Sequence, residues 1–215
     1  MKLVLASSSP RRAELLRAAG IAFEMEAAGV PEVRGAGEPP VEFARRVALE
    51  KARAVAARRP EALVLGADTI VCLGDEVLGK PRDARDAARM LGALSGQVHE
   101  VTTAVALVGP GASHGHPQGL KPPISGGADG AVETAPLRKP PAAVEHETTR
   151  VWMCEVSEEE IDAYIATDEP MDKAGAYAIQ GMASRWVTRI EGDYPTVMGL
   201  QTALVWRMLR EKGYA

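Results

Sequence analysis

The 215-residue chain lacks the short signatures of several common nucleotide- and metal-dependent enzymes. It has no G-x-x-x-x-G-K-[ST] phosphate loop, no G-x-G-x-x-G dinucleotide fingerprint and no H-E-x-x-H metal motif. These absences argue against the usual ATPase, dehydrogenase and metalloprotease sites.

The sequence also lacks a strong charge bias, a long apolar run and a cysteine cluster. Its net charge is −4 and its pI about 5.7, so no global field attracts nucleic acid or an anionic membrane. No apolar run approaches a membrane span, and the N-terminal run is too short for a signal peptide. Cys72 and Cys154 lie far apart in apolar runs, which favours buried thiols over a disulfide or a metal pair. We expect a cytoplasmic protein with neither nucleic acid nor membrane as a partner.

Apolar patterns that suit strands alternate with patterns that suit helices, and the length suits one domain or two lobes that share a core. A hairpin predicted at 70–78 implies antiparallel pairing within the sheet. The expected fold class is therefore α/β with a mixed sheet. Strands are expected at 2–6, 63–67, 98–108, 148–156 and 186–190; helices at 9–20, 41–58, 83–94, 157–166 and 200–210.

Residues 109–141 depart from this pattern, because seven of the 33 are glycine and seven are proline. Such a stretch buries too little apolar surface to offset its ordering entropy, so we expect a flexible insertion within a single domain. His114 and His116 lie there without a third ligand nearby, which disfavours a metal site.

The first candidate for chemistry is the run Ser7-Ser8-Ser9-Pro10-Arg11-Arg12, where Ser9 and Pro10 predict the start of a helix. Arginines in a first helical turn oppose the helix dipole unless an external anion docks there. Free backbone N–H groups, the hydroxyls of Ser7 and Ser9 and two guanidinium groups could hold a phosphate. A solvated arginine pair beside Glu14 is the alternative.

Further candidates follow the predicted strand at 63–67. Asp68 lies at or near its end, where α/β sheets place functional groups, and could bind a metal or act as a general base toward water. An aspartate that caps a turn is the alternative. Lys80, fixed between Gly79 and Pro81, could neutralise a phosphate, while Glu32 and Lys51 are weaker signals taken singly. The run 172–177, which contains Lys173, and Gln180 are typical of a lid or recognition loop.

Six ordered motifs together resemble one known family. They are Leu-Ala-Ser-x-Ser-Pro-Arg-Arg at 5–12, Gly-Ala-Asp-Thr-Ile-Val at 66–71, Leu-Gly-Lys-Pro at 78–81, Leu-Ser-Gly-x-x-His at 94–99, Glu-Pro-Met-Asp-Lys-Ala-Gly-Ala-Tyr at 169–177 and Ile-Gln-Gly at 179–181. On these motifs the chain resembles the Maf family of nucleoside triphosphate pyrophosphatases, over nearly its whole length except 109–147.

The resemblance implies a fold like that of the inosine triphosphate pyrophosphatases, with a twisted mixed sheet and two lobes around a cleft, often in a homodimer. It implies hydrolysis of a nucleoside triphosphate to the monophosphate and pyrophosphate with Mg²⁺ or Mn²⁺. It also implies roles for individual residues: Asp68 as general base, Glu32 with Asp68 at the metal, Arg11, Arg12, Lys51 and Lys80 on the phosphates, and Thr69 and Gln180 with one arginine in base selection.

The run 172–181 resembles the branch of the family that cleaves dTTP and UTP, rather than the branch that acts on 7-methyl-GTP. Two departures stand out: the family pattern usually has Gly-Leu-Pro where this chain has Gly199-Leu200-Gln201, and Gly29 takes a place that is often acidic. A regulator that binds nucleotides without cleaving them, and acts through a partner in cell division, is the alternative function. Such a binder would need the cations but not Asp68.

Overall fold

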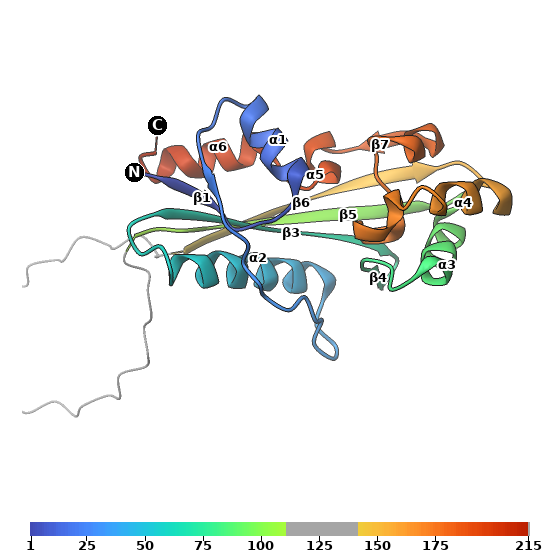
Figure 1. Cartoon of the computed structure of the whole chain (residues 1–215), viewed down its shortest axis with the longest axis horizontal. Coiled ribbons are helices and arrows are strands. Elements are labelled where there is room, and N and C mark those ends of the chain that lie inside the picture. The colour runs from blue at the N-terminus through green and yellow to red at the C-terminus, as the bar shows by residue number, and fades with distance from the viewer. Residues whose placement is uncertain (111–141, 215) are drawn as a thin grey trace, which may run out of the picture.

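The computed structural model describes residues 1–110 and 142–214, and its centre is one twisted sheet. The strands run in the order β2-β1-β3-β5-β6-β7, with β4 paired to β3 (Figure 1). β1 is parallel to β2 and β3, and every other pair is antiparallel, so the predicted mixed sheet is confirmed. The strands are β1 (Leu3–Leu5), β2 (Glu24–Met25), β3 (Leu63–Leu73), β4 (Glu76–Leu78), β5 (Val98–Val108), β6 (Ala142–Met153) and β7 (Val187–Glu191).

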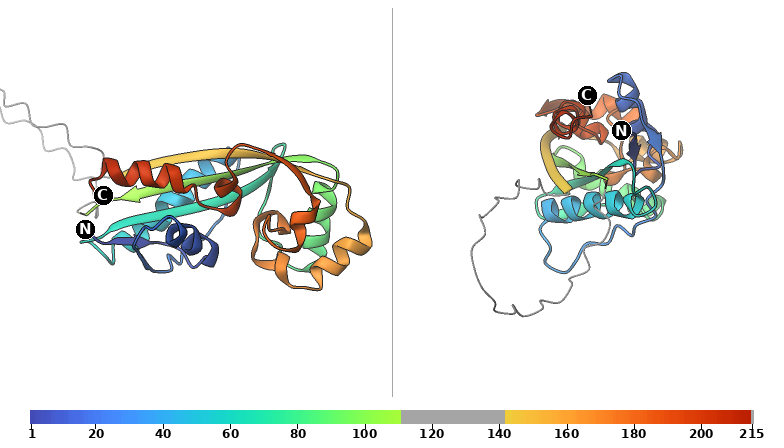
Figure 2. Two further views of the ribbon diagram at one scale, coloured as in Figure 1. Left: turned by 90° about the horizontal axis from the view of Figure 1, so that it is seen from above. Right: turned by 90° about the vertical axis from the view of Figure 1, so that its left-hand side faces the viewer.

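Helices cover both faces of this sheet. The long α2 lies along one face, while α1 and α6 lie on the opposite face at the end where both termini are found (Figures 1 and 2). α3 and α4 cover the far end of the sheet. The helices are α1 (Pro10–Ala18), α2 (Pro40–Ala56), α3 (Ala84–Leu94), α4 (Glu158–Ile165), α5 (Tyr194–Met198) and α6 (Thr202–Glu211); three 3-10 turns are η1 (Glu169–Asp172), η2 (Ala174–Ala176) and η3 (Met182–Trp186).

The core follows the twofold periodicity of the strands. In β3, Val64 faces the cluster under α2, whereas Leu63 and Leu65 face the cluster under α1 and α6. A third cluster gathers α3, α4 and the 3-10 turns around the far halves of β3, β5 and β6, with Trp186 and Tyr164 in edge-to-face contact at 5.1 Å. The long central strands are therefore shared by two lobes, one at each end of the sheet.

The structure corrects several predicted boundaries. β3 is one continuous strand from Leu63 to Leu73, so the prediction that Asp68 follows a strand end is wrong: Asp68 lies in the middle of the strand. β6 begins at Ala142 rather than Thr148. The last helix begins at Thr202 rather than Leu200, and α5 was not predicted. The 98–108 strand is confirmed.

The helix starts show where local sequence was sufficient. Ser157 and Glu160 form a capping box at the start of the helix expected at 157–166, and the Asp83 carboxylate accepts from the Asp86 N–H at 2.8 Å. Ser9 does stand at the cap position of α1, yet its side chain makes no capping hydrogen bond. The predicted insertion, with His114 and His116, lies almost wholly outside the described residues, although the ends of β5 and β6 that flank it are paired at Val108 and Ala142.

Candidate active site

A cleft of about 680 Å³ opens between the two lobes and is lined by both. One wall comes from regular elements, namely the start of α1, the middle of α2 and the middle of β3, together with the loop before α2. The other wall comes from η1, η2 and the residues that follow them. Every predicted site residue lines this cleft: Ser7, Ser9, Arg11, Arg12, Glu32, Lys51, Asp68, Thr69, Lys80, Lys173 and Gln180.

An acidic pair that shares one lysine lies in the cleft. Nζ of Lys51 lies 2.7 Å from Oδ1 of Asp68 and 2.6 Å from Oε1 of Glu32. Lys51 and Asp68 are buried, whereas the Glu32 side chain is 41% exposed. Buried charges need partners of this kind, because an unpaired ion in the interior costs several kcal/mol.

Close packing between α2 and β3 brings Lys51 to Asp68. A Cβ added to Gly66 would lie 2.2 Å from the Ala48 carbonyl oxygen and 2.8 Å from the Ala52 nitrogen. Only glycine lets the helix backbone approach the strand so closely. The glycine two residues before Asp68 therefore sets the depth at which the lysine and the carboxylate meet.

The pKa values of Asp68 and Glu32 are shifted in opposite directions. Burial raises the pKa of Asp68 above its ordinary value, although Lys51 and Arg12 act against that rise. Burial also acts to raise the pKa of Glu32, but the hydrogen bond and charge of Lys51, with smaller effects of Lys80 and Arg12, outweigh it and hold this pKa below its ordinary value. Asp68 is thus the stronger base of the two.

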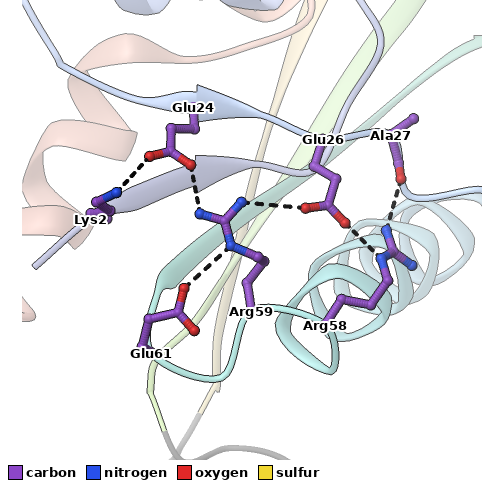
Figure 3. A network of polar contacts seen from close by, with 7 residues as sticks. All are labelled: Lys2, Glu24, Glu26, Ala27, Arg58, Arg59 and Glu61. Atoms are coloured by element: carbon purple, nitrogen blue, oxygen red, sulfur yellow. Dashed lines mark hydrogen bonds and ion pairs between the residues drawn. The ribbon is translucent and has the colours of Figure 1, made fainter.

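One arginine on α2 and one just after it hold the loop that carries Glu32, on either side of that residue. Before Glu32, Nη2 of Arg58 donates to the Ala27 carbonyl oxygen at 2.9 Å, within a network that joins the turn after α2 to Lys2 and to β2 with the residues that follow it (Figure 3). Just after Glu32, Nη2 of Arg46 on α2 donates to the Val33 carbonyl oxygen at 2.9 Å. Since Lys51 lies between Arg46 and Arg58 in the chain, Glu32 is held against it.

The residues present fit a divalent cation of the Mg²⁺ type. Two carboxylates meet at one point in the cleft, and the group now between them is itself a cation, the Lys51 ammonium. Mg²⁺ is commonly held by one or two protein carboxylates, with water and substrate phosphate completing its shell. Residues 1–110 and 142–214 contain no group of three or more acidic, histidine or cysteine ligands. The site would thus depend on the substrate for further ligands.

Arg12 is fixed on the floor of the cleft by three oxygen atoms. Its Nε donates to the Gly199 carbonyl oxygen at 2.9 Å, its Nη2 to Oγ1 of Thr69 at 3.0 Å, and its Nη1 to Oγ of Ser7 at 3.4 Å. Burial lowers the pKa of Arg12, with Asp68 and Glu32 acting in the opposite direction, and arginine remains charged in any case. Its remaining N–H groups can donate to a ligand in a fixed direction.

The N-terminus of α1 faces the same cleft. The Ser9 N–H donates to Oγ of Ser7 at 3.1 Å, so this end is organised by Ser7 while the Ser9 hydroxyl does not cap the helix. Arg11 and Lys80 also line the cleft and make no ion pair within the described part of the chain. A helix start, hydroxyls and cations together are suited to holding phosphate oxygens.

The opposite wall is built from short turns with unusual backbone angles. Gly175 and Ala176 have φ of 70° and 58°, and the Gly175 N–H donates to the Gly79 carbonyl oxygen at 3.0 Å. Lys173 lies on this wall, but its ammonium already donates to the Glu169 carbonyl oxygen at 2.7 Å and pairs with Asp172. Lys173 therefore has less freedom to reach a ligand than Lys80.

Buried polar side chains under the cleft were missed by sequence reasoning. Thr103 on β5 lies beneath Thr69, with 2.9 Å between the two Oγ1 atoms, and Nε2 of Gln201 donates to the Thr103 carbonyl oxygen at 2.6 Å. Nε2 of His99 lies 2.7 Å from the Tyr177 hydroxyl behind the second wall. Threonine within an otherwise apolar strand is the signal that could have indicated the first group.

The chain is similar in sequence to known proteins over nearly its whole length. A family model described as Maf-like protein matches residues 2–212. A dTTP/UTP pyrophosphatase of Koribacter versatilis is 53% identical over 99% of this chain and 95% of its own length. A dTTP/UTP pyrophosphatase of Bacillus cytotoxicus is 42% identical over 98% of this chain and 95% of its own length.

One solved structure also matches over almost the whole chain. It is a nucleoside-triphosphatase / dITP/XTP pyrophosphatase from Mycobacterium abscessus, 16% identical over 98% of this chain and 94% of that chain, with a TM-score of 0.44. A likeness at this level supports no conclusion about activity. In the described residues, no helix combines the length and the hydropathy that are needed to cross a bilayer.

Proposed function

The chain belongs to the family of Maf-like proteins, and from that premise we propose that it is a dTTP/UTP pyrophosphatase. It would convert a nucleoside triphosphate and water into the nucleoside monophosphate and pyrophosphate. Relatives more than 40% identical over nearly the whole chain carry that name.

The observation that carries the proposal is the convergence of opposite charges in one cleft. Arg11, Arg12, Lys51 and Lys80 come from three separate places in the sequence, and all line the cavity that holds Asp68. A triphosphate carries about four negative charges, and several fixed cations in one place stabilise them as a pyrophosphate departs. A structural salt-bridge cluster would not need a cavity of this size.

Asp68 is suited to act on the attacking water. The hydrogen bond from Lys51 takes Oδ1, which leaves Oδ2 for a water molecule. The carboxylate would accept the proton as the water oxygen forms its bond to the α phosphorus, and the bond from that phosphorus to the bridging oxygen breaks. A raised pKa makes the carboxylate a better base near neutral pH. The electron pair leaves with pyrophosphate, whose charge the lysines and Arg11 would stabilise.

Glu32 and Asp68 are the residues that would hold Mg²⁺ or Mn²⁺. When bound, such an ion supplies positive charge that polarises phosphoryl oxygens. Glu32 is suited to this role because its pKa lies below the ordinary value, so that it stays ionised. Ser7 and Ser9 would contact phosphate oxygens, and Arg12, Thr69 and Gln180 would contact the base.

A substrate panel tests the proposal. Purified protein is incubated with dTTP, UTP, CTP, ATP, GTP and 7-methyl-GTP, with Mg²⁺, with Mn²⁺ and with a chelator, and the phosphate products are identified. We expect pyrophosphate with dTTP and UTP and loss of turnover with the chelator. Release of orthophosphate would reject the proposed bond, and preference for 7-methyl-GTP would reject the proposed branch.

The alternative, a nucleotide-binding regulator without turnover, is disfavoured by Asp68. A binder gains nothing from a buried carboxylate whose pKa is raised, since that charge opposes phosphate binding. Tight UTP binding without product under any metal would favour the regulator.

We further propose that the chain acts as one pyrophosphatase domain, as a homodimer, in the cytoplasm where nucleoside triphosphates are available. Light scattering coupled to size-exclusion chromatography checks the dimer. A mass of one chain at micromolar concentration would reject it.

A further inference from the structure

Two threonine hydroxyls form a directed chain beneath the cleft. Thr69 on β3 and Thr103 on β5 are cross-strand partners, and their Oγ1 atoms lie 2.9 Å apart. Thr69 lines the cleft, whereas Thr103 is fully buried and does not reach it. Any effect of Thr103 on a ligand must therefore pass through Thr69.

The direction of this chain follows from counting protons. A threonine hydroxyl has one proton to donate and two lone pairs to accept. Oγ1 of Thr103 donates its proton to the Thr196 carbonyl oxygen at 2.7 Å, and a carbonyl oxygen can only accept. In the contact between the two hydroxyls, Thr69 must therefore donate and Thr103 must accept.

The remaining capacity of Thr69 is then fixed as well. Nη2 of Arg12 donates to Oγ1 of Thr69 at 3.0 Å, and a guanidinium group has no acceptor. The proton of Thr69 points to Thr103, and one of its lone pairs is taken by Arg12. A single lone pair is left for the cleft, so toward a ligand Thr69 is an acceptor and not a donor.

The position of Thr103 is itself held by buried groups. Nε2 of Gln201 donates to its carbonyl oxygen at 2.6 Å, and Gln201 is 1% exposed. Strand β5 is also paired on both sides, by β3 and β6. Thr103 is therefore held in place, and the hydrogen bonds from Thr69 to Thr103 and from Thr103 to Thr196 keep their direction.

We propose that Thr103 is a positioning residue that makes the cleft specific for a base whose contacting edge donates an N–H. This inference rests on the proposed function and adds a reason for its base preference. Uracil and thymine offer a donor at N3, which the lone pair of Thr69 accepts. Cytosine offers a lone pair at N3, which would face the lone pair of Thr69 with no proton between them. A site that leaves a buried polar group unpaired rejects the wrong ligand strongly.

The test compares UTP, CTP and 3-methyl-UTP, which lacks the N3 proton but keeps both carbonyl oxygens. We expect kcat/KM of the wild type for UTP to exceed that for each of the other two by about tenfold or more. In Thr103→Val the Thr69 proton is released and can turn toward the N3 of cytosine. The ratio of UTP to CTP should then fall about tenfold, mainly through KM, while 3-methyl-UTP stays poor.

Two variants control for general disturbance of the site. Thr102 is the neighbouring buried threonine, but its hydroxyl lies 2.7 Å from that of Thr148, so Thr102→Val should leave the nucleotide ratios unchanged. Thr103→Ser keeps the hydroxyl and should keep the selectivity of the wild type. A cleft that is merely loosened would accept 3-methyl-UTP as well as CTP.

Three outcomes would overturn the inference: efficient cleavage of 3-methyl-UTP by the wild type, an unchanged UTP to CTP ratio in Thr103→Val, or equal gains for CTP and 3-methyl-UTP in that variant. The first outcome is measured on the wild type, so it tests the inference even if Thr103→Val does not fold. If the wild type cleaves neither UTP nor dTTP, the proposed function fails. Calorimetric binding of the same three nucleotides then tests the inference by itself.

Discussion

The two walls of the cleft are built in different ways. The first, the regular wall, carries Asp68, Lys51 and Arg12. It consists of a strand and two helices that pack closely through backbone contacts such as that at Gly66. The second, the facing wall, consists of turns of three and four residues, held by side chains that reach in from elsewhere. The Tyr164 hydroxyl, for example, accepts from the Ala178 N–H at 3.2 Å. The buried ion pair is thus placed on the wall of regular elements, while the other wall is anchored at a few points.

Removing the close packing of the regular wall should have the largest effect. Gly66→Ala would bring a methyl group into contact with backbone atoms of α2 that cannot move aside independently. We expect a loss of about 3 kcal/mol or more in the free energy of unfolding, at or above the usual range for overpacking. Urea denaturation measures this loss.

Gly175→Ala is the counterpart on the facing wall. The atoms nearest to its new Cβ would be those of the Val71 side chain, at 3.0 Å, and its φ of 70° would add strain. We expect a smaller loss of about 1 to 2 kcal/mol. Gly92→Ala is the control, because Gly92 is an exposed helix position with open space around it, and it should stabilise α3 by about 0.5 to 1 kcal/mol. Equal losses at Gly66 and Gly175 would contradict the contrast between the walls.

Neutralising one carboxylate on each wall should change kcat by very different amounts in the two variants. Asp68→Asn keeps the shape of the side chain but removes the base, so kcat for UTP should fall by a factor of about 100 or more. Asp172→Asn on the facing wall removes an exposed carboxylate paired with Lys173, and should change kcat by less than about threefold. Pyrophosphate release measures both. Near-normal turnover by Asp68→Asn would remove the residue from its proposed role.

Acid should destabilise the protein through His99, whose ring contacts Tyr177 behind the facing wall. Burial lowers the pKa of His99 from 6.5 to about 4, so the imidazole stays neutral in the folded state while the unfolded chain takes up a proton. The unfolded state binds more protons in this window, so stability falls as the pH falls from about 6.5 to about 4, by about 2 to 3 kcal/mol. Nuclear magnetic resonance titration of the imidazole checks the cause, and a midpoint near 6.5 would contradict it.

Removing one anchor of the facing wall should have a modest effect. Tyr164→Phe deletes the hydroxyl that accepts from Ala178 and donates to Glu169 at 3.0 Å. The Ala178 N–H is then left buried without its partner, at a cost of about 1 to 2 kcal/mol in the free energy of unfolding. Since the wall moves but the charges do not, KM for UTP should rise more than kcat falls. A loss in kcat alone would show that this wall also sets the chemistry.

The regular wall is also the part that the sequence could predict. The continuous apolar run at 63–67 and the Val- and Thr-rich run at 98–108 predict β3 and β5, and the motifs predict the residues that meet in the cleft. Asp68 was misplaced at a strand end because two polar residues usually end a buried strand. In the structure Lys51 and Arg12 satisfy Asp68 and Thr69, so the strand continues.

The facing wall could not be derived in the same way. Its turns have no periodicity, and Ala176 adopts a positive φ that local preference disfavours. That conformation is imposed by tertiary contacts, such as those of Gly175 with Gly79 and of Tyr177 with His99. The hydroxyl chain of Thr69 and Thr103 likewise exists only through the register of β3 and β5, which no local pattern specifies.

The ammonium group that Glu32 and Asp68 share makes them titrate as one coupled unit rather than as two independent acids. Each proton that leaves one carboxyl group changes how strongly the other is held, and the Glu32 charge already acts to raise the pKa of Asp68. In Glu32→Gln, Lys51 would pair with the Asp68 carboxylate alone, and the pKa of Asp68 would fall. A residue on a surface loop thus adjusts the basicity of a buried one without touching it.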